Sequence, residues 1–268
     1  METTVINFNG FDITCITTDF VAHSSIMQAK EWEPHIMGFI KKYNSVYGIE
    51  NIIDVGANFG YHTLFFSRET KGKVYAFEPQ IQNFLLLRNN VNKNNLSNVD
   101  VYNFACGDEE IDVKMPIIET SMNTNMGDFT PNQTYGFNYT LAKTVLIDNM
   151  GFQQIDFIKI DVQGWEKKVL AGAINTLRNY KPVLIVEFEN FQLEKTNTTC
   201  GELFQFIRDN NYHIFYLESA YPSDHVCVHN DKLDDFRVNF KDYIHSHDTD
   251  NDINHNITFG VNEKIVLC

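Results

Sequence analysis

Two acidic residues and two glycines are spaced as a nucleoside-binding turn would require. Asp54 precedes the glycine-bearing segment 56–60, and Glu78 follows the next apolar run, residues 74–77. A glycine turn between a strand and a helix lets backbone N–H groups approach a ligand at the positive end of the helix dipole. A carboxylate at the end of the neighbouring strand can accept both hydroxyls of a ribose. The predicted cofactor-binding residues of this region are Asp54, Gly56, Ala57, Asn58, Gly60 and Glu78.

The turn departs from the dinucleotide-binding pattern. The G-x-G-x-x-G fingerprint needs a second glycine where this chain has Asn58. The pattern therefore favours S-adenosylmethionine (SAM) over NAD as the ligand. Asn58 can brace the turn or contact the methionine part of SAM. Asp54 can brace the N–H groups of the turn or face the methionine ammonium.

Three further side chains are candidates for acid–base chemistry. A hydroxyl that accepts a methyl group must be held in line, and its proton must be removed. Asp161 follows the apolar run 155–160, at the edge where open α/β sheets bind ligands, so it is predicted to contact the cofactor and to position or deprotonate the acceptor. Asp161 can equally cap the helix that follows it. Glu187, after four apolar residues, is the second base candidate because a buried carboxylate needs a partner. His62, in the first turn after the glycine segment, is the third, although such a His is more often structural.

Apolar runs alternate with helical periodicity through most of the chain, which indicates a parallel sheet covered by helices on both faces. Strands are predicted near residues 51–55, 73–77, 99–104, 155–160, 183–188, 212–217 and 225–229. Helices are predicted after Gly60, over 81–91, over 164–179 and near 202–210. The last two strands are joined by the turn-like segment 221–224, which is too short for a crossover helix, so they should pair antiparallel. The predicted fold class is α/β, with a mostly parallel seven-stranded sheet that ends in an antiparallel hairpin.

The main domain is predicted to span residues 49–244, with one region before it, one region after it and an insertion inside it. Residues 1–48 should form an N-terminal β-hairpin and helix. Residues 116–140 are rich in Asn, Thr and Gly, and so long an insertion in a compact domain is usually a lid or a binding loop. Residues 245–268 should form a mobile segment and a C-terminal tail. The N-terminal helix, the insertion and the loop near Asn190 are the expected walls of an acceptor pocket.

Four segments carry a family resemblance when they are taken together and in order. They are DVGANFG at 54–60, FEP at 77–79, GD at 107–108 and KIDVQGWE at 159–166. Over roughly residues 50–190 the chain resembles the FkbM family of SAM-dependent methyltransferases. The resemblance implies a Rossmann-like class I methyltransferase fold and methylation of hydroxyl groups on sugars, polyketides and other secondary metabolites. It also implies that Asp108 receives the adenine amino group, although a simple turn is the competing interpretation.

The leading prediction is an enzyme, a SAM-dependent O-methyltransferase acting on a hydroxyl of a small molecule, sugar or glycan. Methylation of an amine is an alternative, but residues 161–164 read Asp-Val-Gln-Gly, not the Asn/Asp-Pro-Pro-aromatic turn common in such enzymes. An NAD-dependent oxidoreductase is disfavoured by Asn58 and by the terminal hairpin. A non-catalytic SAM-binding or scaffold protein stays open, because the family usually has Glu where this chain has Gln163.

The composition indicates which classes of partner and which cellular compartment to expect. The formal net charge is −14, and an acidic surface disfavours a long nucleic-acid substrate. No apolar stretch approaches the ~20 residues needed to span a bilayer, and no signal peptide is recognised. Five scattered cysteines without C-x-x-C spacing predict reduced thiols and a cytoplasmic protein. We also predict that no metal is required, because the histidines at 213, 225 and 229 lie in the hairpin region and those at 245, 247 and 255 in the polar tail, without the clustering that a metal site needs.

Overall fold

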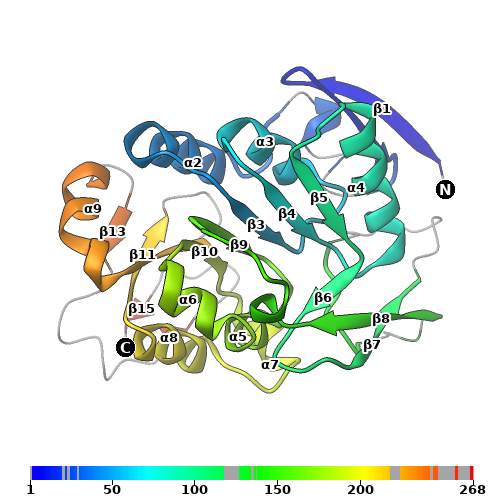
Figure 1. The fold of residues 1–268 in the computed structure, drawn as a ribbon. Helices are drawn as coiled ribbons and strands as arrows, with labels where there is room; N and C mark the ends of the chain where they lie inside the picture. Colours follow the sequence, from blue (N-terminus) through cyan, green and yellow to red (C-terminus); the bar gives the residue numbers. More distant parts are fainter. Residues whose placement is uncertain are drawn as a thin grey trace.

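The computed structural model describes residues 2–19, 22, 25–28, 30–117, 127–133, 136, 138–217 and 224–241, together with the backbone of 244–246, 257–258 and 266–267. Within these ranges the main sheet has eight strands in the order β13-β11-β12-β10-β9-β3-β4-β5 (Figure 1). Their bounds are β3 Ile52–Val55, β4 Val74–Phe77, β5 Val99–Tyr102, β9 Phe157–Ile160, β10 Val183–Glu187, β11 Tyr212–Leu217, β12 Asp224–His229 and β13 Ile244–Ser246.

The strand directions confirm the predicted fold class. Strands β10, β9, β3, β4 and β5 run parallel, and β12 pairs antiparallel with both β10 and β11. The antiparallel hairpin at the end of the sheet was predicted from the short connection between its strands. Strand β13 is an addition to the seven predicted strands, and it begins where the mobile tail was expected. Residues 247–256, 259–265 and 268 of that tail lie outside the described residues.

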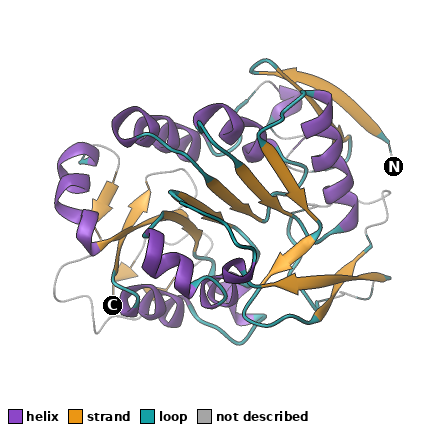
Figure 2. Ribbon diagram, viewed as in Figure 1, coloured by secondary structure: helices purple, strands orange, loops and turns teal. Residues whose placement is uncertain are grey.

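Helices cover both faces of the sheet (Figure 2). One face packs against α2 Pro34–Tyr47, α3 Tyr61–Glu69, α4 Ile81–Lys93 and α9 Leu233–Phe240, and the other against α5 Glu166–Ala171, α6 Ile174–Tyr180 and α8 Cys200–Asp209. Consecutive strand residues point to opposite faces. Ile52 and Phe157 therefore belong to the first core, whereas Ile53 and Ile158 belong to the second. Both faces of the central strands are buried, which explains why these strands read as continuous apolar runs.

The helix predicted over 164–179 is two helices, α5 and α6. The break lies at Gly172 and Ala173. A Cβ on Gly172 would come within 1.9 Å of the Gly107 carbonyl oxygen, so the chain changes direction where it crosses the end of β6 Phe104–Cys106. The apolar periodicity continued through this break and did not reveal it.

The N-terminal hairpin, β1 Thr3–Phe8 and β2 Phe11–Ile16, packs on α4. The Asn90 side chain accepts the Thr14 N–H at 2.7 Å and donates to the Thr14 carbonyl at 2.9 Å. Phe11 meets Phe65 of α3 edge to face. The Asn94 side chain makes the same pair of hydrogen bonds with the backbone of Asp12, so two amides attach the hairpin to this helix.

A second, smaller sheet departs from the predicted alternation. It has the order β6-β8-β7, with β7 Asp112–Pro116 and β8 Tyr139–Val145. The long insertion predicted over 116–140 begins at the end of β7 and ends inside β8, and residues 118–126 of it lie outside the described residues. Its role as a lid stays a prediction, as do the domain limits.

The remaining elements are short: η1 Ile26–Gln28, η2 Ile147–Asn149, α7 Asn190–Glu194, η3 Asn230–Lys232, β14 Ile257–Thr258 and β15 Val266–Leu267.

Candidate functional site

The glycine turn after β3 is shaped by its contact with the end of β9. Gly56 has φ +83°, and a Cβ there would lie 1.8 Å from the Asp161 carbonyl oxygen. Gly60 has φ +95°, and a Cβ there would lie 2.7 Å from Leu87 of α4. Only glycine tolerates both this conformation and this proximity. The turn is therefore held against β9 on one side and α4 on the other, which brings Asp161 close to it.

Glu78 closes the turn from the end of β4. Its Oε2 accepts the Asn58 N–H and its Oε1 accepts the Gln80 N–H, both at 2.8 Å. The side chain is buried, and burial raises the pKa of Glu78 to about 7 despite these two hydrogen bonds. A carboxylate has about four acceptor positions, so two remain for another donor.

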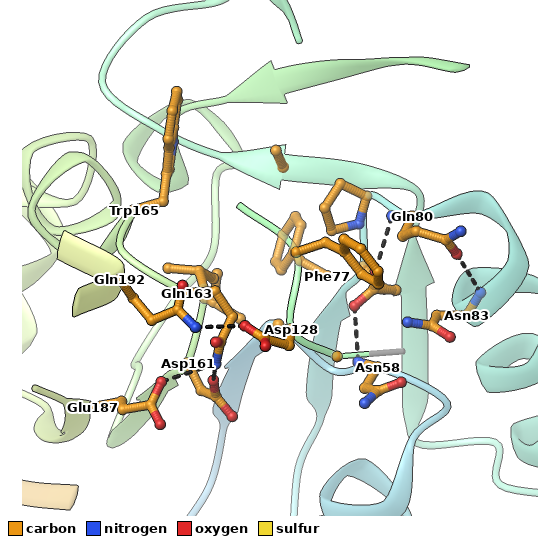
Figure 3. Close-up of a pocket in the computed structure, with 18 of the residues that line it drawn as sticks. Asn58, Phe77, Gln80, Asn83, Asp128, Asp161, Gln163, Trp165, Glu187 and Gln192 are labelled. Carbon is orange, nitrogen blue, oxygen red and sulfur yellow. Dashed lines mark hydrogen bonds between the residues drawn. The ribbon is translucent and has the colours of Figure 1, made fainter. Parts of the chain in front are cut away.

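A cavity of about 850 Å³ opens beside this turn (Figure 3). Its walls come from the turn after β3, the end of β4, β6, residues 127–131, the ends of β9 and β10, α7, the start of β12 and the residues before α2. The volume lies within the range of small-molecule and cofactor sites.

Strained backbone gathers at this cavity. Three non-glycine residues in its walls have positive φ: Glu33 at 45°, Asn58 at 52° and Gln163 at 55°. Such conformations cost free energy and are retained mainly where the surrounding structure holds functional groups in place. The cavity is therefore the leading candidate for the functional site.

Gln163 joins two carboxyl groups at the ends of neighbouring strands (Figure 3). Its Nε2 donates to Asp161 Oδ1 and to Glu187 Oε2, each at 3.0 Å. Thr130 donates to the Gln163 carbonyl oxygen at 2.5 Å and fixes the backbone that carries this amide. Both amide hydrogens are thus used to hold a carboxyl pair at the cavity wall.

The two carboxyl groups have opposite pKa shifts. Burial raises the pKa of Asp161, but the Lys159 ammonium and the hydrogen bonds from Lys159 and Gln163 lower it more, so the net pKa lies below its usual value. Lys159 is buried and lies 3.0 Å from Asp161 Oδ2. Burial and the neighbouring Asp161 charge raise the pKa of Glu187 well above its usual value. A carboxylate with a raised pKa next to one held ionised is an arrangement suited to proton transfer.

A second group of acidic and imidazole side chains lies beside this pair. Asp224 opens β12 directly opposite Glu187 in the antiparallel register, and its Oδ2 lies 2.7 Å from His35 Nε2. Glu33 Oε2 lies 3.4 Å from His62 Nε2. Burial raises the pKa of Glu33 well above its usual value, and the Asp224 charge adds to this shift.

Comparison with known proteins assigns the family. The model of the methyltransferase FkbM domain matches residues 54–214. The chain belongs to the FkbM methyltransferase family. This match covers the last two residues of β3, the glycine turn, Glu78, and both strands that end in the carboxyl pair.

Three of the solved structures to which this chain is similar are named as methyltransferases. An FkbM methyltransferase from Methylobacillus flagellatus has 18% identity and a TM-score of 0.48, covering 74% of this chain and 50% of that one. A putative O-methyltransferase from Klebsiella pneumoniae has 13% identity and a TM-score of 0.48, covering 75% of this chain and 83% of that one. A putative methyltransferase from Streptococcus mutans in complex with SAH has 13% identity and a TM-score of 0.43, with 74% and 96% covered. This chain thus spans about half the length of the first structure. A search of curated protein sequences finds no match.

In this member of the FkbM family, five of the predicted site residues line the cavity: Gly56, Asn58, Glu78, Asp161 and Glu187. The structure therefore brings together the glycine turn, the ribose candidate and the two carboxylate base candidates. Their assigned roles stay predictions.

The other predicted residues lie outside the cavity wall. Asp54 is fully buried and accepts a hydrogen bond at 2.6 Å from the Thr63 hydroxyl of α3, which is not one of the turn N–H groups that it was expected to brace, so its role stays a prediction. Ala57 is buried and contributes a backbone hydrogen bond to Phe77, and Gly60 packs on α4. His62 is buried between Glu33 and Phe66, and burial lowers its pKa well below its usual value.

Asp108 is the sequence-predicted site residue that the geometry supports least. Its side chain is 37% exposed and pairs with Lys168 of α5 at 3.5 Å. The cavity wall at this point is formed by Phe104, Ala105, Cys106 and Trp165 instead. The turn at 107–108 directs Asp108 toward α5, so its proposed contact with adenine has no support in this structure.

Sequence reasoning missed Glu33, His35, Asp224 and the role of Gln163. One signal for Asp224 was present, because an antiparallel strand begins at the edge where its parallel neighbour ends. Glu33 and His35 lie before and inside α2, the N-terminal helix that was expected to form a wall of the acceptor pocket, and this segment does line the cavity. No local pattern singled out these two side chains.

Two further features concern metals and membranes. In the part of the chain that the structure describes, no three His, Cys, Asp or Glu side chains are grouped so that they could hold a metal ion. The expectation that no metal is required stays a prediction. Among the same residues, no helix combines the length and the apolar character that crossing a bilayer requires.

Proposed function

We propose that this protein is a SAM-dependent O-methyltransferase that modifies a hydroxyl group of a small molecule, sugar or glycan. The observation that carries the proposal is the carboxyl pair of Asp161 and Glu187, bridged by Gln163, in one cavity with Glu78 and the glycine turn. The family assignment supports methyl transfer as the reaction and SAM as the cofactor.

The residues of the cavity fit SAM. Glu78 retains acceptor positions for the two ribose hydroxyls, and hydroxyl donors would favour its ionised form over the protonated one. Phe104 and Trp165 form an apolar wall suited to the adenine ring. When bound, SAM supplies an electrophilic methyl group whose C–S bond breaks as the new C–O bond forms, with the electron pair left on sulfur.

Glu187 is the group we assign as proton acceptor. Its raised pKa makes it a stronger base than a solvated carboxylate, and general bases work best when their pKa lies near the working pH. Asp161 acts as a positioning residue: its charge adds to the burial that raises the pKa of Glu187, and Gln163 donates hydrogen bonds to both carboxyl groups. The hydroxyl proton passes to Glu187 as the oxygen becomes bonded to the methyl carbon.

The experiment is transfer of radiolabelled methyl groups from SAM to a panel of sugars and glycans, with the methylated atom identified by NMR. We expect Glu187→Gln to lower kcat by about 10²-fold or more and to leave SAM affinity unchanged, because loss of a general base typically costs that much. Asp161→Asn should also spare SAM affinity and lower kcat by a smaller factor.

Glu166→Gln is the matched control. Glu166 is also buried, burial raises its pKa to about 7, and it lies outside the cavity wall. Parental kcat in Glu187→Gln would exclude Glu187 as the base. SAM binding without transfer to any acceptor would favour the non-catalytic alternative.

A further inference from the structure

The cavity has two halves that are set by the order of the strands. The glycine turn and Glu78 lie at the ends of β3 and β4, on the side of the sheet that leads to β5. Asp161 follows β9, Glu187 ends β10 and Asp224 begins β12. These three strand ends lie side by side, on the β9 side of the point between β3 and β9 where the strand order reverses. If the first half holds the cofactor, the second half is left for the acceptor.

The acceptor half is lined by acidic side chains. Its carboxyl groups are Glu33, Asp161, Glu187, Glu189 and Asp224. None of the described residues in the cavity wall is Lys or Arg, and His35 is the one His among them. Outside the described ranges the sequence contains a single Lys or Arg, Lys264.

The buried ammonium beneath this half does not balance these charges. Lys159 is 2% exposed and pairs directly with Asp161. Glu33 and Asp224 are instead paired with imidazoles, at 3.4 Å from His62 and 2.7 Å from His35. Burial raises the pKa values of Glu33 and Glu187, and the charges of the neighbouring carboxylates Asp224 and Asp161 raise them further. A cation in the cavity would relieve this repulsion, and an anion would increase it.

Aromatic side chains stand beside the carboxyl groups. Trp32 precedes Glu33 in the chain and lines the cavity. Phe191 also lines it, but the Lys195 ammonium already lies 4.5 Å from the centre of its ring, so Trp32 is the main aromatic candidate for a ligand. Aromatic faces attract cations and also pack against sugar rings. The wall therefore suits a ligand that combines a ring or short carbon skeleton with a positive charge.

We propose that the acceptor carries a protonated amino group near its reacting hydroxyl, as in amino sugars and related amino alcohols, and that Glu33 and Asp224 bind the ammonium. This inference rests on the proposed O-methyl transfer. An ammonium held by carboxylates has no lone pair, so the methyl group passes to the neighbouring oxygen. That oxygen loses its proton to Glu187. Phosphorylated or carboxylated acceptors are disfavoured, since their charge would lie among five carboxyl groups.

The test compares free-amine acceptors with their neutral and anionic counterparts. Each member of a panel of amino sugars and aminocyclitols is assayed with radiolabelled SAM beside its N-acetyl derivative and its phosphate ester. We expect kcat/KM at least tenfold higher for a free amine than for its N-acetyl derivative, and no measurable transfer to the phosphate ester. Equal or better transfer to the N-acetyl or phosphorylated compounds overturns the inference, as does absence of transfer to every free amine.

Two variants test whether Asp224 and Glu33 cause the preference for free-amine acceptors. Asp224→Asn and Glu33→Gln should each raise KM for the free amine about tenfold and leave KM for the N-acetyl derivative unchanged. Asp234→Asn changes the net charge equally on the exposed surface of α9, outside the cavity, and should change neither KM. An unaltered preference for the amine in both cavity variants contradicts the assignment.

The outcomes separate this inference from the proposed function. Calorimetric titration with SAM reports cofactor binding without an acceptor. Efficient transfer to the oxygen of neutral acceptors would sustain the O-methyltransferase and refute the amine requirement. Methylation found on nitrogen would refute the proposed O-specificity and our account of the ammonium as a binding group. Failure to bind SAM would refute the proposed function itself.

Discussion

At the scale of single residues, Glu78 has two tasks that compete energetically. It accepts two backbone N–H groups and so braces the glycine turn, and it is also the candidate for the ribose. Its burial without a cation makes the ionised form costly until further donors arrive. The residue is therefore placed to couple turn geometry to cofactor binding.

Replacing Glu78 by Gln should weaken SAM binding. Hydrogen bonds to a charged group contribute about 1.5–3 kcal/mol each, so we expect affinity to fall by roughly 10²-fold or more. Isothermal titration calorimetry measures this directly. Glu166→Gln, which alters a carboxylate buried to a similar extent outside the cavity, should retain parental affinity. Equal affinity in the Glu78 variant and the parent would exclude the ribose assignment.

The raised pKa of Glu78 also predicts a pH dependence of stability. Between pH 4.5 and about 7 the folded Glu78 binds more protons than the unfolded one, so its contribution to stability is present below this window and lost as pH rises through it. The loss is on the order of 3 kcal/mol, at about 1.4 kcal/mol per pKa unit. Denaturant unfolding at pH 5 and pH 7.5 should show a smaller decrease in Glu78→Gln than in the parent. Identical decreases in the two proteins would contradict the shifted pKa.

At the scale of elements, the contact between the glycine turn and the end of β9 sets the geometry of the site. Gly56 lies against the Asp161 carbonyl, and the same β9 terminus carries the Asp161 side chain. Gln163 continues from there and reaches across to Glu187 at the end of β10. Three consecutive parallel strands thus fix the cofactor turn and the carboxyl pair relative to each other.

Gly56→Ala should disrupt this contact. The new Cβ would lie 1.8 Å from a backbone oxygen that cannot rotate away, at a φ of +83°. We expect a loss of more than about 3 kcal/mol of stability, measured by denaturant unfolding, together with weaker SAM binding. Gly38→Ala, inside α2 with no atom within 4 Å of the new Cβ, should be neutral or stabilising by up to about 1 kcal/mol. Comparable effects of the two substitutions would contradict this account.

At the scale of the whole molecule, one apolar core packs on each face of the main sheet. The cavity opens at the carboxyl ends of the parallel strands. The cores are built from opposite faces of the same strands. Elements from the N-terminal region, the second sheet and α7 complete the cavity wall. A ligand in this cavity contacts segments that are distant in the sequence, so binding should stabilise the entire fold.

The free energy of unfolding should therefore increase when SAM binds. At a free SAM concentration 100 times its Kd, the free energy of unfolding should rise by about 2.7 kcal/mol. NADH at the same concentration should leave it unchanged. Chemical denaturation with each ligand measures both effects, and stabilisation by NADH in place of SAM would revive the oxidoreductase alternative.

The strands, the antiparallel hairpin and several site residues could be predicted from local sequence. The apolar runs defined the strands because both faces of a central parallel strand are buried. The short connection before β12 required an antiparallel pair, and the positions of Gly56, Glu78, Asp161 and Glu187 at strand ends placed them at one edge of the sheet.

The tertiary structure alone decided which carboxyl groups meet. Asp224 reaches Glu187 because β12 reverses direction, and Glu33 reaches them because α2 packs on the adjoining layer. Asp108 leaves the site because the chain turns toward α5. Periodicity reports burial along one element, whereas these contacts depend on packing between elements, which no local pattern encodes.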